Sequence, residues 1–249
     1  MAREQVQPTD IIKRLVSRLV VRKSHTYFKY LFIYRKAQHV IGLVPLISKE
    51  GQEDALSKFL VGGHEIVQGE PETLQWYAFK LAESSPAEFN IFDAFPHKEG
   101  RKAHFDGEIP KALGVHGPNL LGAPVDVSKI MVEVLASNIK KVGDGLSSGL
   151  TVGLRVLFTA KPEKKQVVRD FLVNALPLVQ NEQDTASWYA IHFPDTDNFG
   201  IVDFFATEEG REAHLNGKVA AALFASVDEL LTGTPSLNKV DVLAAHITA

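Results

Sequence analysis

Two histidines, His104 and His214, are the side chains in this sequence best suited to chemistry, because each stands in the same pattern, E-G-R-x-A-H-x-x-G. On a helix, Gly100, Ala103 and Gly107 would share one face with His104, and the second copy repeats that spacing. A face of such small side chains lets a helix lie close to a sheet, so each imidazole is expected to point inward. There it could act as a general base for a phenolic or carbon-bound proton, or it could be a structural group bonded to a carboxylate or a carbonyl. Both interpretations stay open.

A carboxylate lies upstream of each histidine. Asp93 and Asp203 occupy the middle of F-x-[IV]-x-D-x-F, an alternating pattern that predicts a strand with the aspartate on an otherwise apolar face. A carboxylate on such a face needs a partner. Arg101, Arg211 or the helix histidine could supply it, so we predict that these aspartates and arginines form structural ion pairs that support the site.

Paired aromatic residues are the third feature. Trp76-Tyr77 and Trp188-Tyr189 stand in predicted strands, where alternation sends one member of each pair toward the helices and the other toward the face between the copies. An aromatic side chain on that face could stack on a planar ligand, or it could simply be part of the core. The predicted catalytic groups are His104, His214, Tyr77 and Tyr189, and the predicted substrate-binding residues are Trp76, Trp188, Phe95, Phe205 and Asn90.

The spacing of these residues shows that the chain is a tandem repeat. Every residue of the histidine pattern recurs at a single offset (214 − 104), and the Trp-Tyr pairs recur at an offset that is two residues longer (188 − 76). A period of roughly 100 residues is that of a small duplicated domain. We predict a basic N-terminal extension at 1–39, a first repeat at 40–139, a linker rich in Gly and Ser at 140–150 and a second repeat at 151–249.

Each copy is expected to have the order strand-helix-strand-strand-helix-strand, which is the ferredoxin-like arrangement. Apolar or alternating runs predict strands at 39–47, 74–81, 89–95 and 129–135 in the first copy, and at 151–158, 185–193, 199–205 and 239–244 in the second. In the closing strands, Lys129-Ile130 is aligned with Lys239-Val240. Such a unit leaves one sheet face bare, so we expect the two bare faces to bury each other in an α+β fold.

The composition excludes several classes of protein. The absence of Cys rules out disulfides, a thiolate nucleophile and Cys-ligated metal, and it fits the reducing cytoplasm. No apolar run approaches the ~20 residues of a membrane-spanning helix. The net charge of −3 argues against general nucleic-acid binding. Since HExxH, P-loop, G-x-G-x-x-G and G-x-S-x-G patterns are absent, we expect no metal site and no NTPase, dinucleotide or α/β-hydrolase chemistry.

The N-terminal extension has a charge opposite to that of the remainder. It carries nine Lys or Arg against two acidic residues, so it is about +7 and the rest of the chain about −10. Its apolar residues between 11 and 20 form one stripe of a predicted helix. A basic amphipathic helix can contact an anionic membrane or a partner, or serve as a mitochondrial presequence. Because Glu4 and Asp10 are unusual in a presequence, we favour a helix packed on its own domain.

These strand and helix patterns resemble the antibiotic biosynthesis monooxygenase (ABM) group of the dimeric α+β barrel superfamily. The resemblance covers about 40–138 and 151–248. It implies a fused pseudo-dimer that closes two ferredoxin-like repeats into one barrel. In the anthrone-oxidising and haem-degrading branches the aromatic residue that closes the strand motif is typically Trp, with an Asn nearby. Here Phe95 and Phe205 stand at the aromatic positions, and Ile91 and Ile201 stand four residues earlier.

The resemblance implies chemistry on small molecules. We predict oxidation of a flat aromatic or polyketide-type substrate by molecular oxygen, without a cofactor, in an apolar cavity between or beneath the sheets. The alternatives are an isomerase or cyclase, a haem-binding or haem-degrading protein, and a non-catalytic ligand-binding or stress protein. Differences between the copies, such as Asn90 against Gly200, allow one site to be active and the other degenerate. The fused chain is expected to be a monomeric pseudo-dimer or a homodimer.

Overall fold

The computed structural model describes residues 40–140 and 142–248, and the predicted helix of the N-terminal extension lies outside them. Both copies have the predicted order of elements. The first repeat contains β1 (Val40–Ile47), α3 (Glu53–Val67), β2 (Gln75–Leu81), β3 (Glu88–Phe95), α4 (Lys98–Phe105), α5 (Glu108–Leu120) and β4 (Met131–Ile139). The second contains β5 (Val152–Thr159), η1 (Pro162–Lys164), α6 (Lys165–Gln180), β6 (Thr185–His192), β7 (Asn198–Phe205), α7 (Glu208–Leu215), α8 (Lys218–Ala225), α9 (Val227–Leu230) and β8 (Ser236–Ile247).

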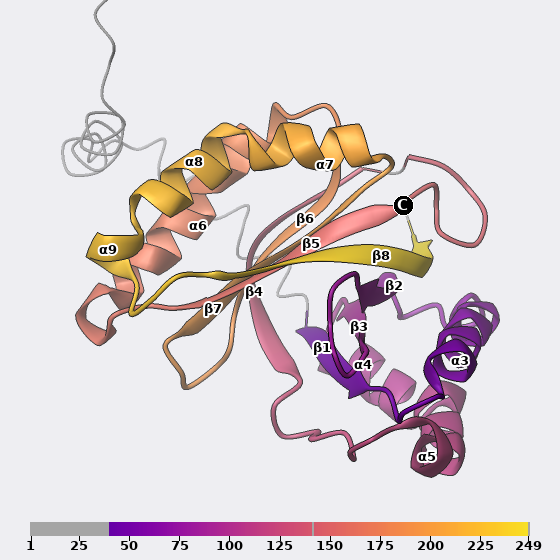
Figure 1. The fold of residues 1–249 in the computed structure, drawn as a ribbon. Helices are drawn as coiled ribbons and strands as arrows, with labels where there is room; N and C mark the ends of the chain where they lie inside the picture. The colour runs from indigo at the N-terminus through magenta and orange to yellow at the C-terminus, as the bar shows by residue number, and fades with distance from the viewer. Residues whose placement is uncertain (1–39, 141, 249) are drawn as a thin grey trace, which may run out of the picture.

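The strands of both repeats form one closed barrel in the order β1-β3-β2-β8-β5-β7-β6-β4 (Figure 1). Within each repeat the sheet order is that of a ferredoxin-like unit. Two antiparallel seams, β2 with β8 and β4 with β6, join the repeats, so the outer strands of one repeat pair with strands of the other. The prediction of a fused α+β barrel is confirmed.

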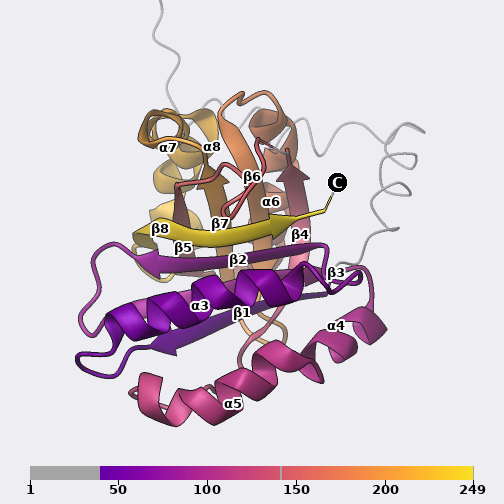
Figure 2. The same cartoon turned by 90° about the vertical axis from the view of Figure 1, so that its right-hand side faces the viewer.

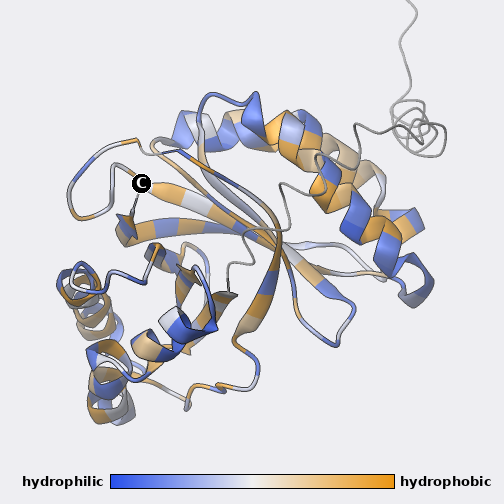
Figure 3. Cartoon of the chain, turned by 180° about the vertical axis from the view of Figure 1, so that it is seen from behind, coloured by the Kyte–Doolittle hydropathy of each residue, from blue (hydrophilic) through white to orange (hydrophobic). Residues whose placement is uncertain are grey.

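The helices cover the outside of this barrel. Figures 1 and 2 show α3, α4 and α5 over the first sheet, and α6 to α9 over the second. The strands are largely apolar, whereas the helices alternate apolar and polar residues, as expected for elements with one buried side (Figure 3). None of the helices in the described part of the chain is long and apolar enough to cross a membrane.

The interior of the barrel is packed with aromatic side chains. Tyr77 and Tyr189 meet there with their hydroxyl oxygens 2.9 Å apart, and the ring of Tyr77 stacks on Phe204 with centroids 4.3 Å apart. Phe92 lies 4.8 Å from Tyr189, and all four side chains are fully buried. Of the two places predicted for a cavity, the space between the sheets is therefore filled by side chains. A groove is found at the other predicted place, beneath the first sheet on its helix side.

The closing strands are longer than predicted. The sequence predicted strands at 129–135 and 239–244, but β4 runs over Met131–Ile139 and β8 over Ser236–Ile247. Each is hydrogen-bonded on both edges, β4 to β1 and β6, and β8 to β5 and β2. These strands are extended by pairing with strands of the other repeat. The apolar periodicity of a single segment cannot indicate such pairing.

The segment that joins the repeats is folded against β8. Ser148 donates from its hydroxyl to the carbonyl of Ala245 at 2.9 Å, and the N–H of Ala245 donates to the carbonyl of Leu146 at 2.9 Å. Gly145 and Gly149 have φ of 90° and 79°, a backbone conformation that favours glycine. The glycines expected to give a linker its flexibility therefore form tight turns here.

Candidate active site

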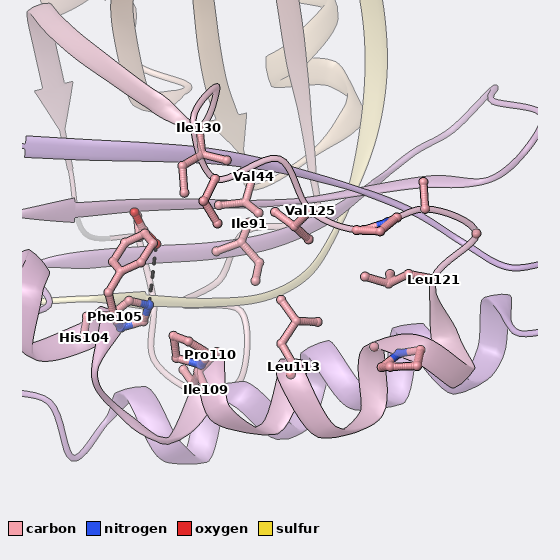
Figure 4. A pocket seen from close by; sticks show the side chains of 18 residues that line it. Val44, Ile91, His104, Phe105, Ile109, Pro110, Leu113, Leu121, Val125 and Ile130 are labelled. Atoms are coloured by element: carbon pink, nitrogen blue, oxygen red, sulfur yellow. Dashed lines mark ion pairs between the residues drawn. The ribbon is translucent and has the colours of Figure 1, made fainter.

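An apolar groove of about 580 Å³ lies between α5 and the outer face of the first sheet (Figure 4). In Figure 4, His104 and Phe105 lie at one end, Ile109 and Leu113 follow along the helix, and Leu121 lies toward the other end. Among the described residues that line the groove, Asp93 and His104 are the only ones with polar side chains. Polar chemistry is therefore confined to one end of an otherwise apolar space.

The groove exists because the first repeat does not close its sheet fully. β5 pairs with β8 over six residues, whereas β1 pairs with β4 only over Val40–Gly42. The N–H of Leu43 still donates to the carbonyl of Ile130 at 2.8 Å. The N–H two residues further on would face the same neighbour, but Pro45 has none. The residues before β4 therefore leave the sheet edge and pass over α5.

The offset between the two repeats also changes here, where the residues before β4 leave the sheet edge. Tyr77 pairs with Ala245 across one seam and Tyr189 with Ser137 across the other. Equivalent positions in β4 and β8 are thus offset by 245 − 137, which is two less than the offset of the two histidines, 214 − 104. The alignment of Lys129-Ile130 with Lys239-Val240 is therefore wrong, because the first repeat has two additional residues before β4.

His104 lies between two carboxylates at the polar end of the groove. Its Nδ1 is 2.6 Å from Oε2 of Glu70, and its Nε2 is 3.6 Å from Oδ2 of Asp93, the ion pair drawn as a dashed line in Figure 4. Thr73 donates its hydroxyl to the same Glu70 oxygen at 2.7 Å. The histidine is 5% exposed and the aspartate 1%. The short contact with Glu70 fixes the orientation of the ring, whereas the longer contact with Asp93 holds Nε2 less tightly.

Local sequence places both groups. Asp93 alternates with Ile91 and Phe95 on the helix side of β3, so it faces α4. Its Oδ1 accepts the N–H of Gly42 at 3.0 Å, and a Cβ at that glycine would lie 2.5 Å from this oxygen. His97 caps α4 by accepting the N–H of Gly100 on its ring nitrogen. In α4, Gly100 and His104 are buried whereas Ala103 is exposed, so only part of the predicted small-residue face lies against the protein. The prediction that His104 points inward is confirmed.

Burial and charge shift the ionisation of this pair. Burial raises the pKa of Asp93 to about 6, although the His104 charge and the Gly42 N–H act against it. Burial would by itself lower the pKa of His104, but the hydrogen bond to Glu70 and the charge of Asp93 outweigh burial and raise that pKa above its ordinary value. The aspartate therefore ionises near neutrality, and the histidine keeps its second proton to a higher pH than free imidazole.

The second repeat has the same three groups without the groove. His214 lies 2.6 Å from Glu182 through Nδ1 and 3.2 Å from Asp203 through Nε2. The cavity beside them measures only about 20 Å³. Phe224 lines that cavity at the position that Gly114 occupies in the first repeat, and β8 stays paired with β5 along its edge. The two sites share their polar groups and differ in the space offered to a ligand.

Glu70 and Glu182 are site residues that the sequence analysis missed. They lie in the turns before β2 and β6, where no periodic pattern draws attention to them. A comparison of the two copies does indicate both glutamates. The offset of the two glutamates (182 − 70) equals that of the Trp-Tyr pairs that follow them. Extending the comparison of the copies a few residues upstream would have found both.

The other predicted site residues lie elsewhere. Trp76 and Trp188 pack in the layers between helices and sheets, while Tyr77 and Tyr189 lie inside the barrel, as alternation predicted. Phe95 and Phe205 contact the two histidine rings at 5.2 and 5.5 Å. None of these six lines the groove beside His104.

Asn90 and the two arginines take part in other contacts. The side chain of Asn90 accepts from buried Arg155 at 3.2 Å, at one end of the barrel interior. Arg101 lies against the sulfur of Met131, and Arg211 binds Glu208 and the carbonyls of Gly153 and Val240. The histidines, rather than these arginines, are the close partners of the two aspartates.

The groove does not favour the haem alternative. An axial histidine must present a free nitrogen lone pair to the iron. Both ring nitrogens of His104 face carboxylates, and the ring is almost completely buried. In addition, no group of three His, Asp or Glu side chains in residues 40–140 and 142–248 is arranged to hold a metal ion.

Comparison with solved structures identifies the fold. A "Putative monooxygenase" from Fusobacterium nucleatum subsp. nucleatum is similar with a TM-score of 0.74 and 12% identity, over 86% of this chain and 96% of that one. An "anthrone oxidase-like protein" is similar with a TM-score of 0.58 and 12% identity, over 85% and 94%. This chain has the antibiotic biosynthesis monooxygenase fold. Because each match covers most of both chains, the complete tandem barrel of this monooxygenase fold is shared.

A third protein is closer in sequence. The "NE2512 protein of unknown function" from Nitrosomonas europaea is 44% identical over 40% of this chain and 96% of its own, with a TM-score of 0.39. That identity places the matched part of this chain in one family with NE2512, whose name states no function. No family model and no curated protein matches the sequence.

Proposed function

We propose that the first repeat is a cofactor-independent oxygenase site for a flat, hydrophobic molecule with an acidic proton. The observation that carries the proposal is the groove of about 580 Å³ whose polar lining groups are the Asp93–His104 pair. The names of similar folds, a "Putative monooxygenase" and an "anthrone oxidase-like protein", support the reaction class. The corresponding site of the second repeat serves as structure, because the cavity of about 20 Å³ beside His214 is too small for a substrate.

The Asp93–His104 pair removes the proton. Asp93 is ionised above pH about 6 and accepts a proton from carbon or oxygen of the substrate. The protonated ring of His104, held by Glu70, lies beside the negative charge that develops on the substrate. This scheme gives the role of base to Asp93, whereas the sequence pointed to the histidine. The apolar walls hold the flat rings and exclude water.

Molecular oxygen completes the reaction. For a substrate with an activated methylene group, the carbanion transfers one electron to oxygen and the resulting radicals combine into a peroxide anion. That anion regains the proton from Asp93, and the hydroperoxide loses water to leave a carbonyl group. The balance is R₂CH₂ + O₂ → R₂C=O + H₂O. No separate reductant is needed, because the substrate anion supplies the electrons.

The test measures oxygen uptake with anthrone as the substrate. Asp93→Asn and His104→Asn are expected to lower kcat/KM by about 10²-fold or more, the contribution typical of a positioned acid or base. In the unsubstituted protein, kcat/KM should rise with pH through about 6 as Asp93 ionises.

The second repeat offers matched controls. Asp203→Asn and His214→Asn alter equally buried groups in the closed site, so they should leave kcat/KM of the folded protein unchanged. Equal losses in both sets of variants, or turnover that survives Asp93→Asn, would contradict the proposed site. Product formed without oxygen uptake would favour the isomerase alternative.

A further inference from the structure

The groove is long and narrow. Its helix wall is formed by residues four apart, namely Ile109, Leu113 and Gly117 of α5 and Leu121 directly after the helix. From Ile109 to Leu121 the chain advances by twelve residues, which at a helical rise of 1.5 Å per residue is a length of about 18 Å. A volume of about 580 Å³ over that length gives a mean cross-section of roughly 30 Å², which suits an aromatic ring edge-on or a single hydrocarbon chain.

The two ends of the groove differ chemically. Asp93 and His104 lie beside Phe105 at the beginning, whereas the walls beyond Ile109 have only apolar side chains among the described residues. The far end lies beside the exposed residues Gly122–Pro124. A ligand that fills this shape has an acidic group at one end and hydrocarbon along the rest.

We propose that the substrate carries an unbranched or isoprenoid tail, which lies along α5 while its acidic aromatic head meets Asp93 and His104. This inference rests on the proposed function and adds the class of substrate. The reacting head needs only the first part of the groove, so the remaining length provides binding energy for the tail through burial of apolar surface.

Two glycines keep the tail half of the groove open. Gly114 and Gly117 correspond to Phe224 and Val227 in the second repeat, where the cavity is closed. A Cβ added at Gly114 would meet no atom within 4 Å. A Cβ added at Gly117 would meet ordinary contacts at 3.6 and 3.9 Å, to the Cδ1 atoms of Leu121 and Leu113. Larger side chains would therefore fit here without disturbing the helix, and they would occupy the groove.

The test uses binding of 4-alkylphenols with tails from propyl to decyl, which carry the acidic hydroxyl and do not react with oxygen by themselves. Calorimetric titration of the full chain should show affinity rising by about fourfold per added methylene, the value for burial of one CH₂. The increase should level off once the tail reaches the mouth beside Pro124.

Gly114→Phe and Gly117→Val introduce the residues of the second repeat. Each should remove most of the dependence of affinity on tail length, while 4-propylphenol still binds. Gly62→Phe is the control, because it adds the same side chain on the exposed side of α3, where a Cβ meets no atom within 4 Å. It should leave the affinities for all the 4-alkylphenols unchanged. Affinity that is independent of tail length in the unsubstituted protein would overturn the inference. So would a series that Gly114→Phe and Gly117→Val leave intact. Both results concern binding alone, whereas absent oxygen uptake would overturn only the proposed reaction.

Discussion

Each site histidine lies between two carboxylates that favour its protonated form, and the arrangement is tighter in the closed site. Burial would lower the pKa of His214, but the charge of Asp203 and the hydrogen bonds to Asp203 and Glu182 raise it to about 10. A pKa raised on folding means that protonation stabilises the folded state. That contribution is complete below the unfolded pKa of about 6.5 and is lost as pH rises toward 10.

The stability difference between the unsubstituted protein and His214→Asn should therefore shrink as pH rises from 7 to 9.5. The slope cannot exceed about 1.4 kcal/mol per pH unit, the value for one proton. Urea unfolding at several pH values measures this difference, and the comparison cancels the titration of groups that do not contact His214. A difference that is constant across this range would show that the folded protein does not hold His214 as a cation.

At the residue scale, short-range patterns predicted side-chain direction well. Alternation predicted that one member of each Trp-Tyr pair faces the helices and the other faces the barrel interior, because the two-residue period of a strand depends only on the strand itself. In the structure Trp76 lies on the helix side and Tyr77 in the barrel interior. The same reasoning put Asp93 on an otherwise apolar face, with the helix histidine as one of its possible partners. It could not distinguish a packed interior from a cavity, so the tyrosines were predicted to be catalytic although they lie inside a filled barrel. That difference depends on which side chains meet across the barrel.

At the scale of elements, one proline separates the open repeat from the closed one. Pro45 stands where Leu157 pairs with Ser236 in the second repeat. The residues that precede β4 thus lose a strand partner that their counterparts keep. The sequence predicted the existence and order of all eight strands, but the length of β4 and β8 follows from pairing across the seams, which no single segment encodes.

Hydrogen exchange should reveal this difference between elements. Residues 126–129 are exposed and lie outside the sheet, whereas Ser236 to Val240 belong to the ladder between β5 and β8. Backbone groups outside a ladder open at low free energy, so we expect the first segment to exchange much faster than the second. Mass spectrometry of the two peptides tests this, with β5 as a protected reference. Equal protection would mean that the first sheet closes in solution and that the groove is lost.

At the scale of the whole molecule, the two repeats are joined by edges and by a shared interior. The seams pair strands of one repeat with strands of the other, and the aromatic core inside the barrel draws on both copies. The pairing of bare faces could be predicted from the sequence, because a one-sided sheet must be covered. The location of the cavity could not, since it depends on two residues added before β4 and on glycines that face the groove.

The hydroxyl pair at the centre of the barrel tests this arrangement. The hydroxyl of Tyr77 is hydrogen-bonded to Ser187 at 3.1 Å and to Tyr189 at 2.9 Å, while the hydroxyl of Tyr189 is hydrogen-bonded only to Tyr77 among the described residues. Tyr77→Phe therefore leaves a buried hydroxyl without its partner and should cost about 1–3 kcal/mol of unfolding free energy. Tyr189→Phe should cost less, because Tyr77 retains Ser187, and the double variant should cost less than the sum of the two. Neither substitution should change kcat/KM for anthrone, since the pair does not line the groove. Lost turnover in a variant of unchanged stability would place the chemistry inside the barrel instead.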